Sequence, residues 1–448
     1  MTKVERPDVI VIGAGVAGVA AALSARREGA SVLVVDGHAG ASALGSGAWD
    51  VATDPDATLD DIFSPRRTIA QEIARVRRDH PHHPYAALGE QARELVAAAH
   101  ELVLTALGIF APLDLDGHGA LVVTDVGLVR RAATAQRPVL YLAAHTRATV
   151  AVGVLRGYRA VDGAFVAASL ADLADQAGDE RRFTSIDVEF FRRRDDAVLH
   201  PHEVAAIADA ADGRERLVAS LSRAVAGMGF AAVLLPPVLG LLEDGVAADV
   251  SAQLDARVGE LVTPLAGPQS LRLLRRIDAA LEGAGCERLR ASVARIVPDR
   301  SGTRVEIADG GKVISAGAVV VATGKHVGGG LGVRRGEVRE TLASLPIYSD
   351  GLPMALASSE SGRDPVVLFG KSPFASGPGF RCGVGYDEEL RALGDSGDAA
   401  SPDLFVAGAL LDGFDPGRDG TGAGCAATTG FVAGLNAAKH AARSPRTR

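Results

Sequence analysis

The feature that most constrains the fold is a glycine-rich turn between a buried strand and a helix near the N-terminus. The apolar run Val9–Ile12 is what we expect of a parallel strand buried on both faces. Gly13, Gly15 and Gly18 follow it in the spacing Gly-x-Gly-x-x-Gly and open a helix, and a second strand then ends at Asp36. This order of strand, glycine turn, helix, strand and acid predicts a doubly wound α/β fold that binds a dinucleotide.

Each residue of this fingerprint has a physical role. Gly13 permits the tight turn, Gly15 lets the backbone approach a pyrophosphate, and Gly18 lets the helix and strand pack closely. The helix N-terminus offers unpaired N–H groups and the positive end of its dipole to the phosphates. Asp36 can accept hydrogen bonds from both ribose hydroxyls, and its charge would repel a 2′-phosphate, which disfavours NADP.

Two later segments favour FAD over NAD. One apolar strand ends in a Thr-Gly turn, and another ends in a glycine before a glycine-rich loop and a C-terminal helix. Flavoproteins of the two-dinucleotide-binding type carry such segments, with the last loop along the pyrimidine edge of the flavin, where a helix N-terminus stabilises negative charge. We therefore expect FAD as the cofactor. Its expected contacts in these segments are Thr323, Gly324, Gly408, Gly420, Thr421 and Gly422.

The loop after the second strand, residues 43–50, falls where these flavoproteins lay backbone against the isoalloxazine ring. Ser46 and Gly47 are therefore expected at the cofactor, with the Ser46 hydroxyl offered to flavin N5. Trp49, the only tryptophan, suits a packing role and a ring contact equally well.

The length of the chain, 448 residues, is too great for one core and predicts two lobes or one large domain that carries an insertion. We expect a Rossmann-like FAD-binding domain, with a parallel sheet and a β-meander, over residues 1–54 and 231–448. Residues 55–230 are expected to form an inserted α+β cap or substrate lobe. Within it, His80–Pro84 contains three histidines and two prolines, which indicate a surface loop rather than a metal site.

Composition excludes several classes of function. The net charge is −8 and no basic block occurs, so we expect no nucleic-acid partner. Cys286, Cys382 and Cys425 lie too far apart in sequence for an iron–sulfur cluster or a zinc site, so we expect no metal in this chain. There is no signal-peptide pattern and no apolar stretch of spanning length. We therefore expect a cytoplasmic protein, and any association with the inner face of the membrane is expected to be peripheral or through a partner subunit.

Together these motifs resemble the B-subunit family of anaerobic glycerol-3-phosphate dehydrogenase. Besides the N-terminal fingerprint, the resemblance rests on residues 45–50, 322–331, 383–391 and 408–416. Its most specific part is Gly413-Phe414-Asp415-Pro416 with the glycines and Cys425 that follow, while residues 55–230 match weakly. The paired cysteines that this family carries around the final glycines are represented here by Cys425, with Thr421 at the other place.

The resemblance implies a flavin protein that pairs at the membrane with two other subunits, a larger flavin-bearing one (A) and an iron–sulfur one (C). Such a complex oxidises sn-glycerol 3-phosphate to dihydroxyacetone phosphate and passes the electrons towards quinone. Members of the family are usually described as binding FMN. The fingerprint with Asp36 instead predicts FAD, because this acid has little purpose without an adenosine ribose.

Oxidation of a secondary alcohol needs flavin N5 within about 3.5 Å of the carbinol carbon and a base for the hydroxyl proton. His326, just past the Thr-Gly turn, is the candidate base, and Arg381 and Arg418 are the candidate cations for a substrate phosphate. Two alternatives stay open. One is a flavin-bearing electron-transfer or assembly subunit without its own substrate site, and the other is a stand-alone FAD-dependent oxidoreductase of another substrate.

Overall fold

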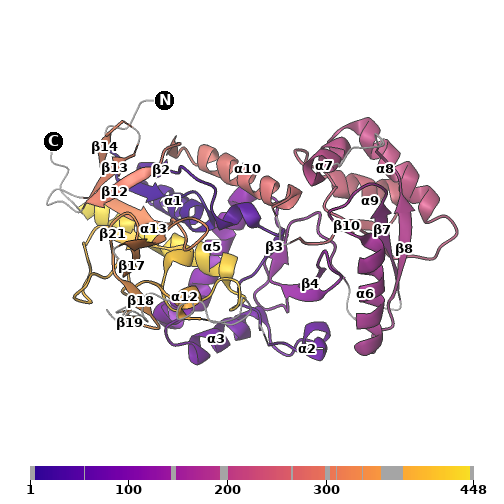
Figure 1. Ribbon diagram of the computed structural model, residues 1–448, viewed down its shortest axis with the longest axis horizontal. Helices are drawn as coiled ribbons and strands as arrows, with labels where there is room; N and C mark the ends of the chain where they lie inside the picture. Colours follow the sequence, from indigo (N-terminus) through magenta and orange to yellow (C-terminus); the bar gives the residue numbers. More distant parts are fainter. Residues whose placement is uncertain are drawn as a thin grey trace. The chain divides into compact units, whose positions relative to one another are not determined.

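The computed structural model describes residues 6–54, 56–142, 148–191, 200–263, 266–297, 303–308, 310–334, 337–354 and 377–443. The chain divides into two compact units. The first consists of Met1–Ser42, Ala70–Leu107 and Ile277–Arg448, and the second of Ala43–Ile69 and Gly108–Arg276. Each unit contains a parallel sheet of its own (Figure 1).

The first unit is built on a five-stranded parallel sheet in the order β11-β2-β1-β15-β21. Its central strands are completely buried, which explains why they are unbroken apolar runs. Because all five strands run in one direction, their carboxyl ends meet at one edge of the sheet. The strands are β11 (Glu287–Leu289), β2 (Val32–Val35), β1 (Val9–Ile12), β15 (Ala318–Val321) and β21 (Leu404–Val406).

Three helices pack together in the first unit, α1 (Val16–Arg27), α5 (Ala92–Leu107) and α13 (Gly422–Arg443). Glycine allows α13 to approach α1 closely, since a Cβ on Gly430 would lie 2.2 Å from the carbonyl oxygen of Ala17. The expected β-meander is also present, as the antiparallel strands β12 (Val293–Val297), β13 (Arg304–Ile307) and β14 (Val313–Ser315). The predicted Rossmann-like α/β architecture is therefore confirmed.

Shorter elements complete the first unit. They are the helices α3 (Ile69–Asp79), α4 (Pro84–Ala87) and α12 (Pro378–Arg381), and the strands β16 (Leu331–Arg334), β17 (Glu337–Glu340), β18 (Ile347–Ser349), β19 (Leu352–Pro353) and β20 (Gly383–Val384).

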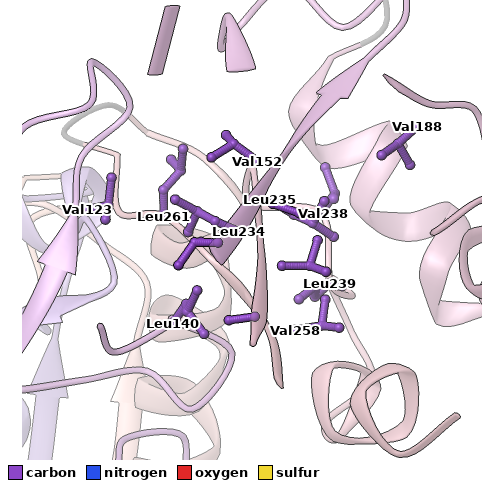
Figure 2. Packing of buried hydrophobic residues seen from close by; sticks show 14 of the residues in the cluster. Val123, Leu140, Val152, Val188, Leu234, Leu235, Val238, Leu239, Val258 and Leu261 are labelled. Atoms are coloured by element: carbon purple, nitrogen blue, oxygen red, sulfur yellow. The ribbon is translucent and has the colours of Figure 1, made fainter. Parts of the chain in front are cut away.

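The second unit contains a four-stranded parallel sheet in the order β10-β9-β7-β8. Its strands are β10 (Arg257–Glu260), β9 (Ala232–Leu235), β7 (Thr149–Leu155) and β8 (Arg182–Val188), and its helices are α2 (Leu59–Phe63), α6 (Gly163–Gln176), α7 (Pro201–Asp209), α8 (Ala211–Ala224) and α9 (Val246–Leu254). Buried aliphatic side chains from β7, β9 and β10 fill its core, among them Val152, Leu234 and Val258 (Figure 2). The chain also forms two short antiparallel pairs here, β3 (Ala48–Trp49) with β6 (Thr134–Ala135) and β4 (Ala120–Val123) with β5 (Val129–Ala132).

The boundaries of the two units differ from the predicted ones. Residues 70–107, expected in the inserted lobe, belong to the first unit because Val96, Ala99 and Val103 of α5 are buried where that helix packs on α1 and α13. Residues 231–276, expected in the FAD-binding domain, belong to the second unit because β9 and β10 complete its sheet. Helical periodicity shows that a helix has an apolar face, but it does not show which partner covers that face.

The structure adds two observations on the other expectations. Among the described residues, no helix is both long and apolar enough to cross a membrane. In the same part of the chain, no three His, Cys, Asp or Glu side chains are grouped so that they could hold a metal ion.

Candidate functional site

The predicted cofactor segments of the first unit meet at the carboxyl edge of its sheet. Gly13 has a φ of +103°, and a Cβ there would lie 2.5 Å from the carbonyl oxygen of Ala322 at the end of β15. Gly408, which follows β21, has a φ of +74°, and its Cβ would lie 2.6 Å from the side chain of Ala17 in the first turn of α1. The fingerprint, the Thr-Gly turn and the C-terminal loop are therefore neighbours.

The three fingerprint glycines have different surroundings. A Cβ on Gly18 would lie 1.8 Å from the carbonyl oxygen of Gly13, so the helix and strand could not pack with any larger residue there. Among the described residues, a Cβ on Gly15 would come within 4 Å only of the Ser42 hydroxyl, at 3.2 Å. The space in front of Gly15 is therefore open, as an approaching pyrophosphate requires.

Ser42 is a site residue that sequence reasoning missed. Its Oγ accepts a hydrogen bond of 3.1 Å from the backbone N–H of Val16, in the first turn of α1. This N–H belongs to the group of amides that a phosphate would meet, so the hydroxyl lies where it can contact the same anion. The contact joins residues 26 positions apart, and no local pattern marks it.

Asp36 lies at the end of β2, as predicted, but two arginines hold its carboxylate. Arg288 donates from Nε to Oδ1 at 2.9 Å and from Nη2 to Oδ2 at 2.8 Å, and Arg290 donates from Nη1 to Oδ2 at 3.2 Å. The hydrogen bonds to Asp36 are the main cause that raises the pKa of Arg288 above its ordinary value. The sequence did not point to either arginine, because β11 lies beside β2 in the sheet although Arg288 follows Asp36 by 252 positions.

The histidine-rich segment is not simply a surface loop, because His83 is completely buried. Its Nδ1 accepts the backbone N–H of Tyr85 at 3.0 Å, so its Nε2 carries the proton and donates to the Thr421 hydroxyl at 3.1 Å. Burial is the main cause that lowers the pKa of His83 to about 3, and the ring is therefore neutral. The predicted cofactor residue Thr421 is thereby tied to the segment before α4.

Lys325 follows the Thr-Gly turn and is buried. Its Nζ donates to the carbonyl oxygen of Phe380 at 2.9 Å and to that of Phe414 at 3.2 Å. Burial lowers the pKa of this ammonium group to about 8. Its two hydrogen bonds connect the end of β15 to α12 and to the glycine-rich loop after β21, so its role in the structure is to hold these segments together.

Asp412 lies in the loop after β21. Its carboxylate accepts hydrogen bonds from the backbone N–H groups of Asp350 at 3.2 Å and Gly351 at 2.7 Å. Burial raises the pKa of this carboxyl to about 6.

The three residues predicted to act on the substrate differ in exposure and in pairing. Arg381 donates from Nη1 to both oxygens of Asp419, at 2.9 and 3.0 Å, and from Nη2 to the carbonyl oxygen of Gly413 at 2.8 Å. This pairing argues against Arg381 as a free cation for a substrate phosphate. His326 is exposed, and its Nε2 lies 2.9 Å from the carbonyl oxygen of Gly379. Arg418 is exposed, and within the described residues its guanidinium makes no ion pair.

Ser46, Gly47 and Trp49 belong to the second unit. Gly47 has a φ of +84°, and a Cβ there would lie 2.8 Å from the side chain of Gln269. Trp49 is buried and packs edge-on against Phe110 at 5.0 Å between ring centroids, which is a packing role. Contact of Ser46 and Gly47 with the cofactor stays a prediction.

The geometry of the first unit fits FAD. The space at Gly15 admits a pyrophosphate, Asp36 lies at the next strand end, and the buried hydroxyl of Thr323 has no hydrogen-bond partner in the described part of the chain. A family model described as "FAD binding domain" matches residues 8–425, from before β1 into α13. The chain belongs to this FAD-binding family. Its cofactor is FAD.

Named relatives of the chain are B subunits of one enzyme. The chain is similar to a protein of Yersinia pseudotuberculosis that is named as the B subunit of anaerobic glycerol-3-phosphate dehydrogenase, with 29% identity over 95% of this chain and 97% of that protein. A second relative, from Halobacterium salinarum and named as a probable B subunit of the same enzyme, is 32% identical over 51% of this chain and 52% of its own length. The resemblance seen in the motifs is therefore confirmed.

Two solved structures align with most of the chain at low identity. A flavocytochrome c3 fumarate reductase in an open conformation aligns with 98% of this chain and 79% of its own, at 13% identity and a TM-score of 0.43. A 3-ketosteroid-delta4-(5alpha)-dehydrogenase from Rhodococcus jostii RHA1 aligns with 98% of both chains, at 15% identity and a TM-score of 0.39.

Proposed function

We propose that this FAD-dependent oxidoreductase is the B subunit of an anaerobic glycerol-3-phosphate dehydrogenase, oxidising sn-glycerol 3-phosphate to dihydroxyacetone phosphate with electrons passed towards quinone. The observation that carries the proposal is the match along 95% of the chain to a relative of that name. The carboxyl edge of the first sheet supports it, because Gly13 lies against Ala322 after β15 and Gly408 lies against Ala17 of α1. When bound, FAD supplies the hydride acceptor for this reaction.

In this proposal, the first turn of α1, the fingerprint glycines and Ser42 hold the pyrophosphate, and Asp36 accepts the adenosine ribose hydroxyls. Thr323, Gly324, Gly408, Gly420, Thr421 and Gly422 line the ring. The buried pair His83–Thr421 supports this part, because it fixes the start of α13 and so fixes where the helix dipole points.

The residues that we propose to act on the substrate are the two exposed candidates, His326 and Arg418. His326 accepts the proton of the carbinol hydroxyl, and the carbonyl oxygen of Gly379 near its Nε2 stabilises the charge that the imidazole gains. Arg418 binds the substrate phosphate. Arg381 acts through Asp419, keeping the glycine-rich loop in shape. The flavin-bearing A and iron–sulfur C subunits would complete the enzyme and bring this chain to the inner face of the membrane.

The test is anaerobic reduction of the purified chain by sn-glycerol 3-phosphate, followed by the flavin absorbance near its visible maximum. The proposal expects bleaching without any other subunit. It also expects Arg418→Gln to raise the KM for glycerol 3-phosphate about tenfold or more, as the loss of a charged hydrogen bond implies, with little change in stability. The matched variant Arg381→Gln should reduce stability instead.

A second candidate function is a flavin-bearing electron-transfer or assembly subunit whose partner holds the substrate site. The ion pair between Arg381 and Asp419 favours it, because that pair leaves only one of the two predicted phosphate-binding arginines uncommitted. Bleaching by glycerol 3-phosphate only after the A subunit is added would support this role. Bleaching by other hydroxylated compounds, and not by glycerol 3-phosphate, would support a stand-alone oxidoreductase.

A further inference from the structure

The carboxylate of Asp36 has less free hydrogen-bonding capacity than its proposed role needs. An ionised carboxylate has about four acceptor positions. Arg288 uses one on each oxygen, and Arg290 uses a third, on Oδ2. The 2′- and 3′-hydroxyls of an adenosine ribose would bring two more donors. One of the arginine contacts must therefore give way when the ribose binds.

The two arginines differ in how firmly they are held. The side chain of Arg288 is 19% exposed, makes a bidentate contact with Asp36 and also donates from Nη1 to Asp278. The side chain of Arg290 is 64% exposed and makes a single contact with Asp36, at 3.2 Å, and one with Asp278, at 3.1 Å. Bidentate pairs are stronger and more directional than single contacts, and exposed ion pairs contribute little. Arg290 is therefore the contact that yields.

We propose that Arg288 is a positioning residue that orients Asp36 for the adenosine ribose, and that Arg290 covers the same carboxylate until the ribose displaces it. The proposal rests on the FAD placement given above, with the pyrophosphate at α1. Arg288 is the less exposed of the two and contacts both oxygens of Asp36, so it holds one edge of the carboxylate and leaves the other edge for the ribose. The same arrangement keeps Asp36 compensated by a cation before FAD binds.

This assignment makes the two arginines determinants of nucleotide specificity. FAD contains an adenosine ribose and FMN does not. A change at Arg288 should therefore alter the affinity for FAD and leave the affinity for FMN as it was. A change at Arg290 should have the opposite sign, because it removes a competitor of the ribose hydroxyls.

The experiment is titration of the flavin-free full-length protein with FAD and, separately, with FMN, followed by flavin fluorescence. Arg288→Gln should raise the Kd for FAD about tenfold or more, the effect of losing a charged hydrogen bond, and leave the Kd for FMN unchanged. Arg290→Gln should lower the Kd for FAD, and an unchanged Kd would contradict the role of Arg290 as a competitor of the ribose. Arg295→Gln is the matched control, because this arginine is as exposed as Arg290 but pairs with Glu306 on the β-meander. It should change neither constant.

A second pair of variants keeps the test decisive. If Arg288 acts through Asp36, then Asp36→Asn should weaken FAD binding, and adding Arg288→Gln to it should weaken binding no further. Equal losses of FAD and FMN affinity in Arg288→Gln would overturn the proposal, because they would indicate general damage to the fold. A loss in Arg290→Gln as large as that in Arg288→Gln would overturn it too, since Arg290 would then bind the nucleotide itself.

Different results would contradict the adenosine site and the role of Arg288. A wild-type protein with equal affinity for FAD and FMN would contradict the adenosine site and the proposal with it. A wild-type protein that prefers FAD, with Arg288→Gln indistinguishable from it, would contradict the role of Arg288 alone.

Discussion

The two units of this protein carry parallel sheets with different carboxyl edges. In the first unit, β1, β15 and β21 are each followed within a few residues by a glycine with positive φ, and β2 is followed by an acid. In the second unit, residues 232–240, which cover β9 and the segment after it, are buried without interruption and include two prolines. A glycine with positive φ, Gly157, also follows β7, so the two edges differ in the acid after β2 and in the buried segment after β9.

Charge is also arranged differently at the two edges. Glu260, at the end of β10, is completely buried and receives Arg272 at 2.8 Å on each oxygen and the backbone N–H of Leu239 at 2.6 Å. Asp162 caps α6 by accepting the N–H groups of Ala164 and Phe165, which places a negative charge where a phosphate would need a free amide. In contrast, α1 starts at Gly15 with no side chain of its own as a cap.

Strand order does not by itself make a nucleotide site. Both sheets are parallel. In the second sheet, the strand order reverses between β7 and β9, and open α/β sheets often bind ligands at such a point. The two edges differ in their helix starts and in their charges. Helix α1 begins with no side-chain cap of its own, whereas Asp162 caps α6, and the carboxylate at the end of β10 is buried with Arg272.

The largest expected effect comes from the first edge. Gly15→Val should give a folded protein without flavin, because among the described residues the new Cβ contacts only the Ser42 hydroxyl, while the side chain would occupy the place of the pyrophosphate. The measurement is the ratio of visible to ultraviolet absorbance after purification, beside the far-ultraviolet circular dichroism. Gly18→Val is the control, and it should fold poorly because its Cβ meets backbone at 1.8 Å. A yellow Gly15→Val protein would contradict the placement of FAD.

The second expected effect concerns the second edge. Arg272→Met should destabilise the second unit by about 3–5 kcal/mol, because it leaves the Glu260 carboxylate buried without its cation. Flavin bound per folded molecule should stay the same. Urea unfolding measures the loss, and the double variant Glu260→Leu with Arg272→Met should recover part of it. Flavin loss at unchanged stability would instead give the second sheet a role in binding the cofactor.

The smallest expected effect is a difference in pH dependence between His83 and Asp412. The folded-state pKa of His83, about 3, lies below its unfolded value of 6.5, so its contribution to stability is present at neutral pH and is lost as pH falls from about 6.5 towards 3. The folded-state pKa of Asp412, about 6, lies above its unfolded value of 3.8, so its contribution is lost as pH rises from about 4 to 6. The two slopes have opposite signs, and each is limited to about 1.4 kcal/mol per pH unit.

Variants separate these two slopes. Between pH 4 and 6, the free energy of unfolding of His83→Gln should rise less steeply with pH than that of the wild type, and that of Asp412→Asn should rise more steeply. Denaturant unfolding at several pH values measures both. A slope that is unchanged in His83→Gln would mean that this histidine is not neutral and buried in the folded protein.

Much of the first unit could be predicted from the sequence because its signals are local. The glycine spacing, the fully apolar strands and the acid after β2 all lie within the first 36 residues. The missed residues act across long separations, with 252 positions between Asp36 and Arg288 and 338 between His83 and Thr421. Histidines between prolines suggest an exposed turn, and only the tertiary contact with Thr421 explains why His83 is buried.

The second unit was less predictable for a related reason. The apolar runs of β7 and β9 are typical of buried parallel strands, but 76 residues separate Leu155 from Ala232 and no fingerprint marks the sheet they form. The chain passes from one unit to the other at residues 42–43, 69–70, 107–108 and 276–277, and no change of composition marks these boundaries in the sequence.

The most direct test of which edge holds FAD is amide hydrogen exchange of the full-length protein, compared with and without the cofactor. Amide exchange should slow on FAD binding at residues 13–18, 36–42 and 408–424, and it should not change at residues 156–163 and 236–240. Protection confined to the second pair of segments, with residues 13–18 exchanging equally in both states, would contradict this prediction.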